Sequence, residues 1–153
     1  MKSLICFGQR VSGDYIFHSN FGGLISITED VHHWTPEERA KAKSHIAAYK
    51  AVRHLLGKDF FPLFPQPMAL EAWDGWEFHD SDSDEGFALV FRSRSPQEDV
   101  RIRLRGPRLG KKYSLEDPYS GRREIFDGKR LLEEGISLKL PLNGTRLWTY
   151  RPV

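Results

Sequence analysis

The chain has 153 residues, 39% of them hydrophobic, and its 23 basic and 21 acidic residues leave a net charge of +2. This length corresponds to about one domain, the apolar content excludes a disordered chain, and the balanced charge disfavours nucleic-acid or membrane binding through bulk charge. The single cysteine, Cys6, excludes an internal disulfide and a cysteine-built zinc cluster.

Residues 1–34 are the least regular stretch, with short apolar pieces separated by glycines. The pieces at 4–7, 15–17 and 24–27 allow two short strands. The apolar start ends at Gly8, too soon for a signal peptide, and no apolar run approaches the roughly 18 residues of a membrane span. We therefore expect a cytoplasmic chain with no membrane partner.

Phe21, Gly22 and Gly23 form a permissive step within this stretch. Glycine adopts positive φ without a steric penalty and lets other groups approach the backbone closely. The step is therefore typical of a turn, which we favour, and equally of a loop beside a ligand.

The best local signal in the chain is Thr35-Pro36-Glu37-Glu38. Thr35 is an N-cap residue, Pro36 suits the first helical position, and Glu38 completes a capping box. The pattern predicts an amphipathic helix that ends at Gly57. Its apolar stripe consists of Ala42, Ile46, Tyr49, Val52 and Leu56. Such a stripe needs a surface to pack against.

Residues 59–68 hold three prolines interleaved with Phe60, Phe61 and Phe64. Proline at this density prevents a helix and removes hydrogen-bond donors from a strand, so we predict an extended connector anchored by its aromatic residues. The connector divides the chain into an N-terminal segment with its helix (1–58), the connector itself (59–68) and a third unit (69–153).

The unit from 69 to 153 is a series of short strand-like runs, each closed by a turn signal. Eight such runs at a spacing of about 10 residues are typical of an antiparallel sandwich or barrel. They cover 70–73, 76–79, 87–92, 100–104, 113–116, 124–126, 136–140 and 147–150, and Asp74-Gly75 is the first turn. The predicted fold is mainly β: an antiparallel β-sandwich of about eight short strands, preceded by one amphipathic α-helix and an irregular N-terminal segment.

Motifs for catalysis and metal binding fail in detail. The six histidines show no metal-ligand spacing, and no Gly-x-Ser-x-Gly elbow occurs. The acidic loop 80–85 places carboxylates two residues apart, but it lacks the glycine and glutamate positions of a calcium loop. We interpret it as a solvated hairpin loop and expect no catalytic residue, no metal ion and no cofactor.

The stretch 92–112 is basic, with eight Lys or Arg residues against two acidic ones. Arg101, Arg103 and Arg105 alternate with apolar residues, as on the wet face of a half-buried strand. Such charge can bind phosphates, but the stretch 92–112 itself contains no aromatic residue on which a base could stack, and the first one is Tyr113 just after it. A nucleic-acid partner is therefore disfavoured.

Trp73 and Trp76 flank the predicted Asp74-Gly75 turn, a location that would leave at least one of them partly exposed. An exposed indole can stack on a sugar ring, although core packing is its more common use. Both interpretations stay open.

Eight segments follow one another in a definite order: WTPEER (34–39), YKAVR (49–53), FPQP (64–67), WEFHD (76–80), EGFALVFR (85–92), RLRG (103–106), DPYSG (117–121) and GISL (135–138). Their order and spacing resemble the C-terminal end of melibiase-type α-galactosidase glycoside hydrolases, from about residue 21 onward. In that family a (β/α)8 barrel carries catalysis and a C-terminal antiparallel β-sandwich packs against it.

The resemblance implies that the helix from 35 to 56 is similar to the last barrel helix and that 68–153 is similar to the sandwich. The catalytic aspartates of the family lie on earlier barrel strands, so none can be placed in this chain. Phe21, Gly22 and Gly23 become candidates for the border of a sugar pocket. The candidates for carbohydrate contact are Trp73, Trp76 and Tyr119.

The leading hypothesis is a non-catalytic accessory domain, which partners a glycoside hydrolase barrel or self-associates through the helix and connector. A stand-alone carbohydrate-binding module that uses Trp73 and Trp76 is the alternative. A nucleic-acid binder that uses Arg101, Arg103 and Arg105 is the third hypothesis.

Overall fold

The computed structural model describes residues 5–6, 9–10, 13–25, 27 and 30–153. Its centre is an antiparallel six-stranded sheet of order β3-β4-β5-β10-β7-β8. These strands are β3 (Asp59–Pro62), β4 (Trp73–Asp80), β5 (Glu85–Arg92), β7 (Lys112–Glu116), β8 (Arg123–Asp127) and β10 (Gly144–Pro152).

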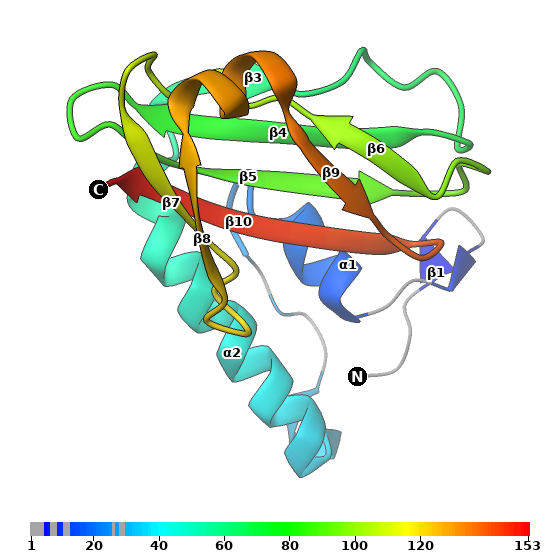
Figure 1. Ribbon diagram of the computed structural model, residues 1–153. Coiled ribbons are helices and arrows are strands. Elements are labelled where there is room, and N and C mark those ends of the chain that lie inside the picture. The colour runs from blue at the N-terminus through cyan, green and yellow to red at the C-terminus, as the bar shows by residue number, and fades with distance from the viewer. Residues whose placement is uncertain (1–4, 7–8, 11–12, 26, 28–29) are drawn as a thin grey trace.

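Two further layers cover this sheet (Figure 1). One face carries a two-stranded antiparallel sheet of β6 (Asp99–Ile102) and β9 (Ile136–Lys139), with the short helix η3 (Arg130–Glu134) beside it. The other face carries α1 (Gly13–Ser19) and α2 (Pro36–Val52), which continues into η2 (Arg53–Leu55). The predicted mainly antiparallel β fold with one long helix is confirmed, and its two sheets are unequal in size.

The short elements near the N-terminus are β1 (Ile5–Cys6), β2 (Gln9–Arg10) and η1 (Val31–His33). Strands β1 and β2 pair as an antiparallel hairpin, and residues 4 and 7 of the predicted run lie outside the described part. Residues 15–17, one of the three apolar pieces among which two short strands were possible, belong to α1 instead. A helix of seven residues is only two turns long, too short for its period to be read from the sequence.

The helix α2 begins as its sequence predicts. The Thr35 hydroxyl accepts from the Glu38 backbone N–H at 3.2 Å, and the Glu38 carboxylate accepts from the Thr35 N–H at 2.9 Å. The helical stretch ends before Gly57, whose φ of 90° is the left-handed conformation expected of a terminating glycine. The fully buried residues of the two helices α2 and η2 are Ala42, His45, Ala48, Val52 and Leu55. Ala42 and Val52 are buried as predicted. At the other three positions the buried residue is the one just before the predicted residue, so that part of the predicted stripe is off by one residue.

Replacing Thr35 by alanine is expected to lower the free energy of unfolding by about 1 kcal/mol, because the Glu38 backbone N–H loses the hydroxyl that accepts its hydrogen bond. Urea denaturation followed by circular dichroism measures this. Lys43→Ala, in the exposed middle of the same helix, is the control and should change stability by less than about 0.5 kcal/mol. Equal stability of the Thr35 variant and the wild type would show that the cap contributes nothing.

The connector prediction holds in part. Residues 59–62 form β3, an edge strand that pairs with β4, and Pro62 stands at its end where a missing N–H is tolerated. The Asp74-Gly75 turn is wrong, because both residues lie inside β4. A Cβ at Gly75 would overlap the Leu89 carbonyl oxygen on β5, so the glycine serves close packing rather than a turn.

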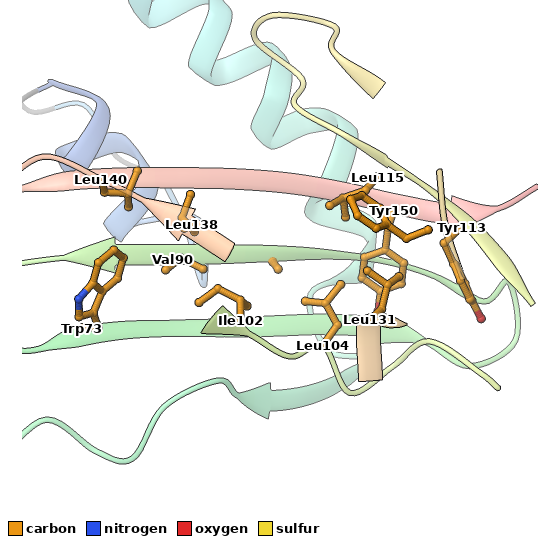
Figure 2. Close-up of a cluster of buried hydrophobic side chains, with 12 residues drawn as sticks. Trp73, Val90, Ile102, Leu104, Tyr113, Leu115, Leu131, Leu138, Leu140 and Tyr150 are labelled. Atoms are coloured by element: carbon orange, nitrogen blue, oxygen red, sulfur yellow. The ribbon is translucent and has the colours of Figure 1, made fainter. Parts of the chain in front are cut away.

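The core has two parts, one on each face of the central sheet. Figure 2 shows the part beneath β6 and β9, where Trp73, Val90, Ile102 and Leu138 meet. The part beneath the helices contains Phe17, Phe21, Val52, Phe87 and Leu147 among others. Strand β5 is buried on both faces for this reason. Among the described residues, neither α1 nor α2 combines the length and apolar composition that a membrane-spanning helix requires.

Candidate functional site

Polar side chains from four elements meet where the two helices touch the sheet. Helix α1 supplies Asp14 and His18, α2 supplies Lys41 and His45, the turn between β7 and β8 supplies Asp117 and Tyr119, and β10 supplies Thr145 and Arg146. They line a cavity of about 430 Å³. We refer to this set as the histidine–tyrosine site.

A chain of hydrogen bonds runs through the site. The Tyr119 hydroxyl lies 2.7 Å from His18 Nε2 and 2.8 Å from His45 Nδ1. The outer nitrogen of each ring is also bonded: His18 Nδ1 lies 2.9 Å from Thr145 Oγ1, and His45 Nε2 lies 2.8 Å from Asp14 Oδ1. Every polar atom of both imidazoles therefore has a partner.

The direction of this chain follows from the acceptor at its end. A carboxylate only accepts, so neutral His45 carries its proton on Nε2, and its Nδ1 accepts from the Tyr119 hydroxyl. The Tyr119 oxygen then accepts from His18 Nε2–H, and His18 Nδ1 accepts from the Thr145 hydroxyl. With both imidazoles neutral, each donor meets one acceptor.

Burial sets the protonation of the inner groups. It lowers the pKa of His18 to about 3, with the neighbouring His45 adding to the effect. It also raises the pKa of the Tyr119 phenol. The hydrogen bond from His45 holds the pKa of Asp14 well below its usual range. At neutral pH, His18 is uncharged, Tyr119 is a phenol and Asp14 is a carboxylate.

The order Asp14, His45, Tyr119 is that of a carboxylate, a base and a hydroxyl, as in a nucleophilic triad. Burial raises the pKa of the Tyr119 phenol, so its oxygen keeps its proton at neutral pH. The hydrogen bonds to His18 and His45 fix the position of the Tyr119 ring.

Two ion pairs frame the cavity. Arg146 Nη1 lies 2.6 Å from Asp117 Oδ2, and Lys41 Nζ lies 3.0 Å from Asp14 Oδ1. Burial alone would raise the pKa of Asp117, but hydrogen bonds from the Tyr119 and Ser120 backbone and the charge of Arg146 lower it overall. The buried Nε of Arg146 has no hydrogen-bond partner among the described residues. The site thus offers carboxylates, cations and a partly exposed phenol around one cavity.

Of the predicted carbohydrate contacts, Tyr119 belongs to this site and the two tryptophans do not. Trp73 and Trp76 are three residues apart on one strand, so their rings point to opposite faces of the sheet. Trp73 is 8% exposed and donates to the Gln97 carbonyl at 3.0 Å (Figure 2). Trp76 packs against Phe91 on the helix side, with ring centroids 5.0 Å apart. One sugar ring cannot stack on both.

The Phe21-Gly22-Gly23 step forms a turn, in which the Gly23 N–H donates to the Asn20 carbonyl at 3.1 Å. Phe21 is fully buried and packs edge-on against His18. The Gly23 carbonyl accepts from the Tyr49 hydroxyl at 2.7 Å. Phe21 thus contacts the histidine–tyrosine site through His18, and none of the three residues lines its cavity.

The histidines of the site are the residues that sequence reasoning missed. Asp14 and His18 are four apart on α1, and Lys41 and His45 are four apart on α2, so each pair lies on one helix face. That spacing was a readable signal for α2, whereas for α1 the helix itself was not recognised. Within the described part of the chain, no three His, Cys, Asp or Glu residues are placed to hold a metal ion.

A second polar network lies under the Arg105-Gly106 loop, in the core. Glu77 is fully buried and accepts from the Arg105 N–H at 2.6 Å, the Gly106 N–H at 3.0 Å and the Tyr150 hydroxyl at 2.6 Å. Burial raises the pKa of Glu77. Both carboxylate oxygens are engaged, so the network is structural.

The acidic loop 80–85 also contributes a buried carboxylate to the core. Asp84 is 3% exposed, with a φ of 59°, and accepts from Lys111 at 2.6 Å and from the Tyr113 hydroxyl at 2.8 Å. The loop was predicted to be solvated, which is wrong for Asp84 and right for the exposed residues 81–83.

The layered fold is that of a mainly antiparallel β domain with helices on one face of its central sheet, and comparison with known proteins shows what this fold resembles. No protein-family model matches the sequence, and no curated protein matches it either. Among solved structures, the GH36 α-galactosidase AgaA from Geobacillus stearothermophilus superposes with a TM-score of 0.81 at 22% identity over 95% of this chain and 20% of that chain.

Two other structures agree. An α-galactosidase from Lactobacillus brevis gives a TM-score of 0.80 at 17% identity, over 95% of this chain and 21% of its own. A putative α-N-acetylgalactosaminidase from Bacillus halodurans gives 0.66 at 9% identity, over 91% of this chain and 30% of its own. The chain therefore has the fold of one region of GH36 α-galactosidases and spans about one fifth of their length. The expected resemblance is confirmed at the level of fold.

Proposed function

We propose that this chain is a non-catalytic accessory β-sandwich domain with a structural or carbohydrate-positioning role beside a glycoside hydrolase barrel. The observation that carries the proposal is the superposition of 95% of the chain on only one fifth of GH36 α-galactosidases. The chemistry of the histidine–tyrosine site agrees with it, because that site restrains a phenol instead of activating a nucleophile.

Surface composition supports an association partner. The connector leaves Phe60 55% exposed and Met68 94% exposed, next to Leu70 at 42%. These three exposed apolar residues lie within eleven positions of the sequence, and contiguous exposed apolar surface marks an interface. We propose that the connector contacts a barrel or a second copy of the chain. The stripe of α2 plays no part in this proposal, since it packs on the sheet of its own chain.

Catalysis is tested with 4-nitrophenyl α-galactoside. The wild-type chain is expected to release no nitrophenol above the buffer rate, because Tyr119 stays protonated and hydrogen-bonded on both sides. Asp14→Asn is the matched variant, since it keeps the shape of the side chain. A turnover rate that depends on Asp14 or Tyr119 would overturn the non-catalytic assignment.

A stand-alone carbohydrate-binding module is the second candidate, favoured by Tyr119, which is 38% exposed beside charged pairs that can bond sugar hydroxyls. Isothermal titration with galactose tests it. Tyr119→Phe keeps the ring and is expected to bind within about threefold of wild type, while Tyr119→Ala loses binding by about tenfold or more, as expected when a stacking ring is removed. Absence of galactose binding by the wild type at millimolar concentrations would remove this candidate.

A further inference from the structure

A second hollow lies on the opposite side of the molecule from α1 and α2. It is a groove of about 750 Å³, lined by residues of the edge strand β3, of β6 with the segment that follows it, and of η3. Figure 1 shows β6 on the face of the central sheet opposite the helices. Phe61, Leu63 and Leu132 give the groove an apolar lining. Three arginines at alternate positions line it as well: Arg101 on β6, and Arg103 and Arg105 in the segment that follows β6.

These three arginines differ from other basic residues of the protein because they have no carboxylate partner among the described residues. Arg146, Lys111 and Arg123 each hold a carboxylate at 2.6 to 2.7 Å. The guanidinium groups of Arg103 and Arg105, in contrast, form no ion pair and no hydrogen bond with another described residue, and that of Arg101 makes one bond of 3.3 Å to the Glu134 carbonyl. Their donors face the groove without an acceptor.

The spacing of the arginines indicates the shape of the missing acceptor. All three are exposed, while Ile102 and Leu104 between them are buried. Alternate residues of an extended chain lie roughly 6.6 Å apart on one face. A second extended polypeptide has the same repeat, so carboxylates at its alternate positions can meet all three guanidinium groups, which bind carboxylates in a bidentate fork.

We propose that this groove binds an acidic, extended segment of a partner polypeptide with carboxylates at alternate positions and apolar side chains between them. The carboxylates pair with the arginines, and the apolar side chains lie on Phe61, Leu63 and Leu132. Among the described strands, β3 pairs only with β4 and β6 pairs only with β9, so both are edge strands. Phe61 on β3 and Arg101 on β6 therefore lie beside sheet edges that can accept an added strand.

A second copy of this chain is a poorer occupant. Its loop 80–84 carries carboxylates at alternate positions, but Asp84 is buried on Lys111 and Tyr113, and Asp80 pairs with Lys58 at 3.2 Å. Single-stranded nucleic acid fits less well too, because Phe61 is the one aromatic residue in the lining and base stacking needs several.

The test is fluorescence anisotropy with a short labelled peptide in which glutamate and valine alternate. The full chain is expected to bind it, with affinity falling as salt rises from about 0.05 M to about 0.3 M. The double variant Arg103→Gln/Arg105→Gln is expected to bind at least about tenfold more weakly, because two charge-assisted contacts are lost. Both side chains are exposed, so the variant should keep the wild-type circular dichroism spectrum.

The matched control is Lys50→Gln/Arg53→Gln, which removes the same charge from exposed positions in the helical layer. It should leave binding within about twofold of wild type, since the pairs it could make are remote and screened. Three results would each overturn the proposal: no binding of the glutamate peptide at millimolar concentration, equal binding of a lysine–valine peptide, or an unchanged affinity of the Arg103/Arg105 variant. Binding of a single-stranded oligonucleotide in preference to the peptide would assign the groove to nucleic acid instead. The test does not depend on the histidine–tyrosine site, so the proposed function can fail or stand separately.

Discussion

Replacing Glu77 by alanine is expected to lower the free energy of unfolding by about 3 to 5 kcal/mol, because the fully buried carboxylate accepts from three donors at once. In the variant the Tyr150 hydroxyl keeps only His79 Nδ1 at 2.9 Å, and water would have to enter the space to satisfy the Arg105 and Gly106 N–H groups. Guanidinium denaturation at pH 7, followed by tryptophan fluorescence, measures the loss.

Glu77→Gln separates the hydrogen bonds from the packing. The glutamine side chain fills the same volume, but its amide nitrogen would face a donor where a carboxylate oxygen accepted before. We expect a loss of about 2 kcal/mol, smaller than that of alanine. Glu124→Ala is the control, an exposed residue paired only with Arg122, and should cost less than about 1 kcal/mol. A loss below about 1 kcal/mol for Glu77→Ala would show that water replaces the carboxylate freely.

The importance of Glu77 was invisible in the sequence for a physical reason. In Trp76-Glu77-Phe78-His79, the alternation predicts a strand with one polar face, and β4 has that alternation. Both faces are nonetheless buried, because the loop at Arg105 and Gly106 folds over the polar one. A Cβ at Gly106 would overlap His79 and Tyr150, so this covering depends on a glycine almost thirty residues along the chain. Sequence periodicity indicates local structure, but it does not show whether a distant loop covers the polar face of a strand.

Two predictions that rested on local chemistry are confirmed, whereas a third, the Asp74-Gly75 turn, is wrong. The capping box at Thr35 and the terminating Gly57 depend on a few adjacent residues, and each is where the pattern placed it. The histidine–tyrosine site depends instead on residues 14, 45 and 119, which only the tertiary fold brings together. Tyr119 was selected because of the resemblance of its segment to a family, not because of any pattern that showed its two histidine partners.

Acid should destabilise the protein through His18. The folded chain keeps His18 neutral down to a pKa of about 3, whereas the ordinary value is 6.5. Between these values the unfolded chain binds a proton that the folded chain does not, so the free energy of unfolding falls as the pH falls. One such group accounts for about 2 kcal/mol between pH 6.5 and pH 4.5. Above about pH 7.5 the group is neutral in both states and adds almost no pH dependence.

The titratable and charged groups around His18 determine the pH range in which its effect on stability can be measured. Asp14 of α1, His45 of α2, Asp117 and Tyr119 of the β7–β8 turn and Arg146 of β10 face it. The lowered pKa values of Asp14 and Asp117 add stability that is lost only when the pH falls below about 4, outside the window. The raised pKa of Glu77 acts in the opposite direction, since its contribution falls as the pH rises. This contribution of Glu77 is the same in the wild type and in a His18 variant, so it cancels when the two are compared.

The comparison is therefore between the wild type and His18→Gln, with unfolding measured at pH 6.5 and at pH 4.5. We expect the wild type to lose about 2 kcal/mol more than the variant over this interval. His32→Gln, an exposed position in η1, should behave as the wild type does, because that side chain is solvated whether or not the chain is folded. If His18→Gln does not fold, the His18 Cε1 proton in the wild-type NMR spectrum answers the same question. A resonance that titrates near pH 6.5 would contradict the buried, neutral His18 imidazole that takes part in the hydrogen-bond chain.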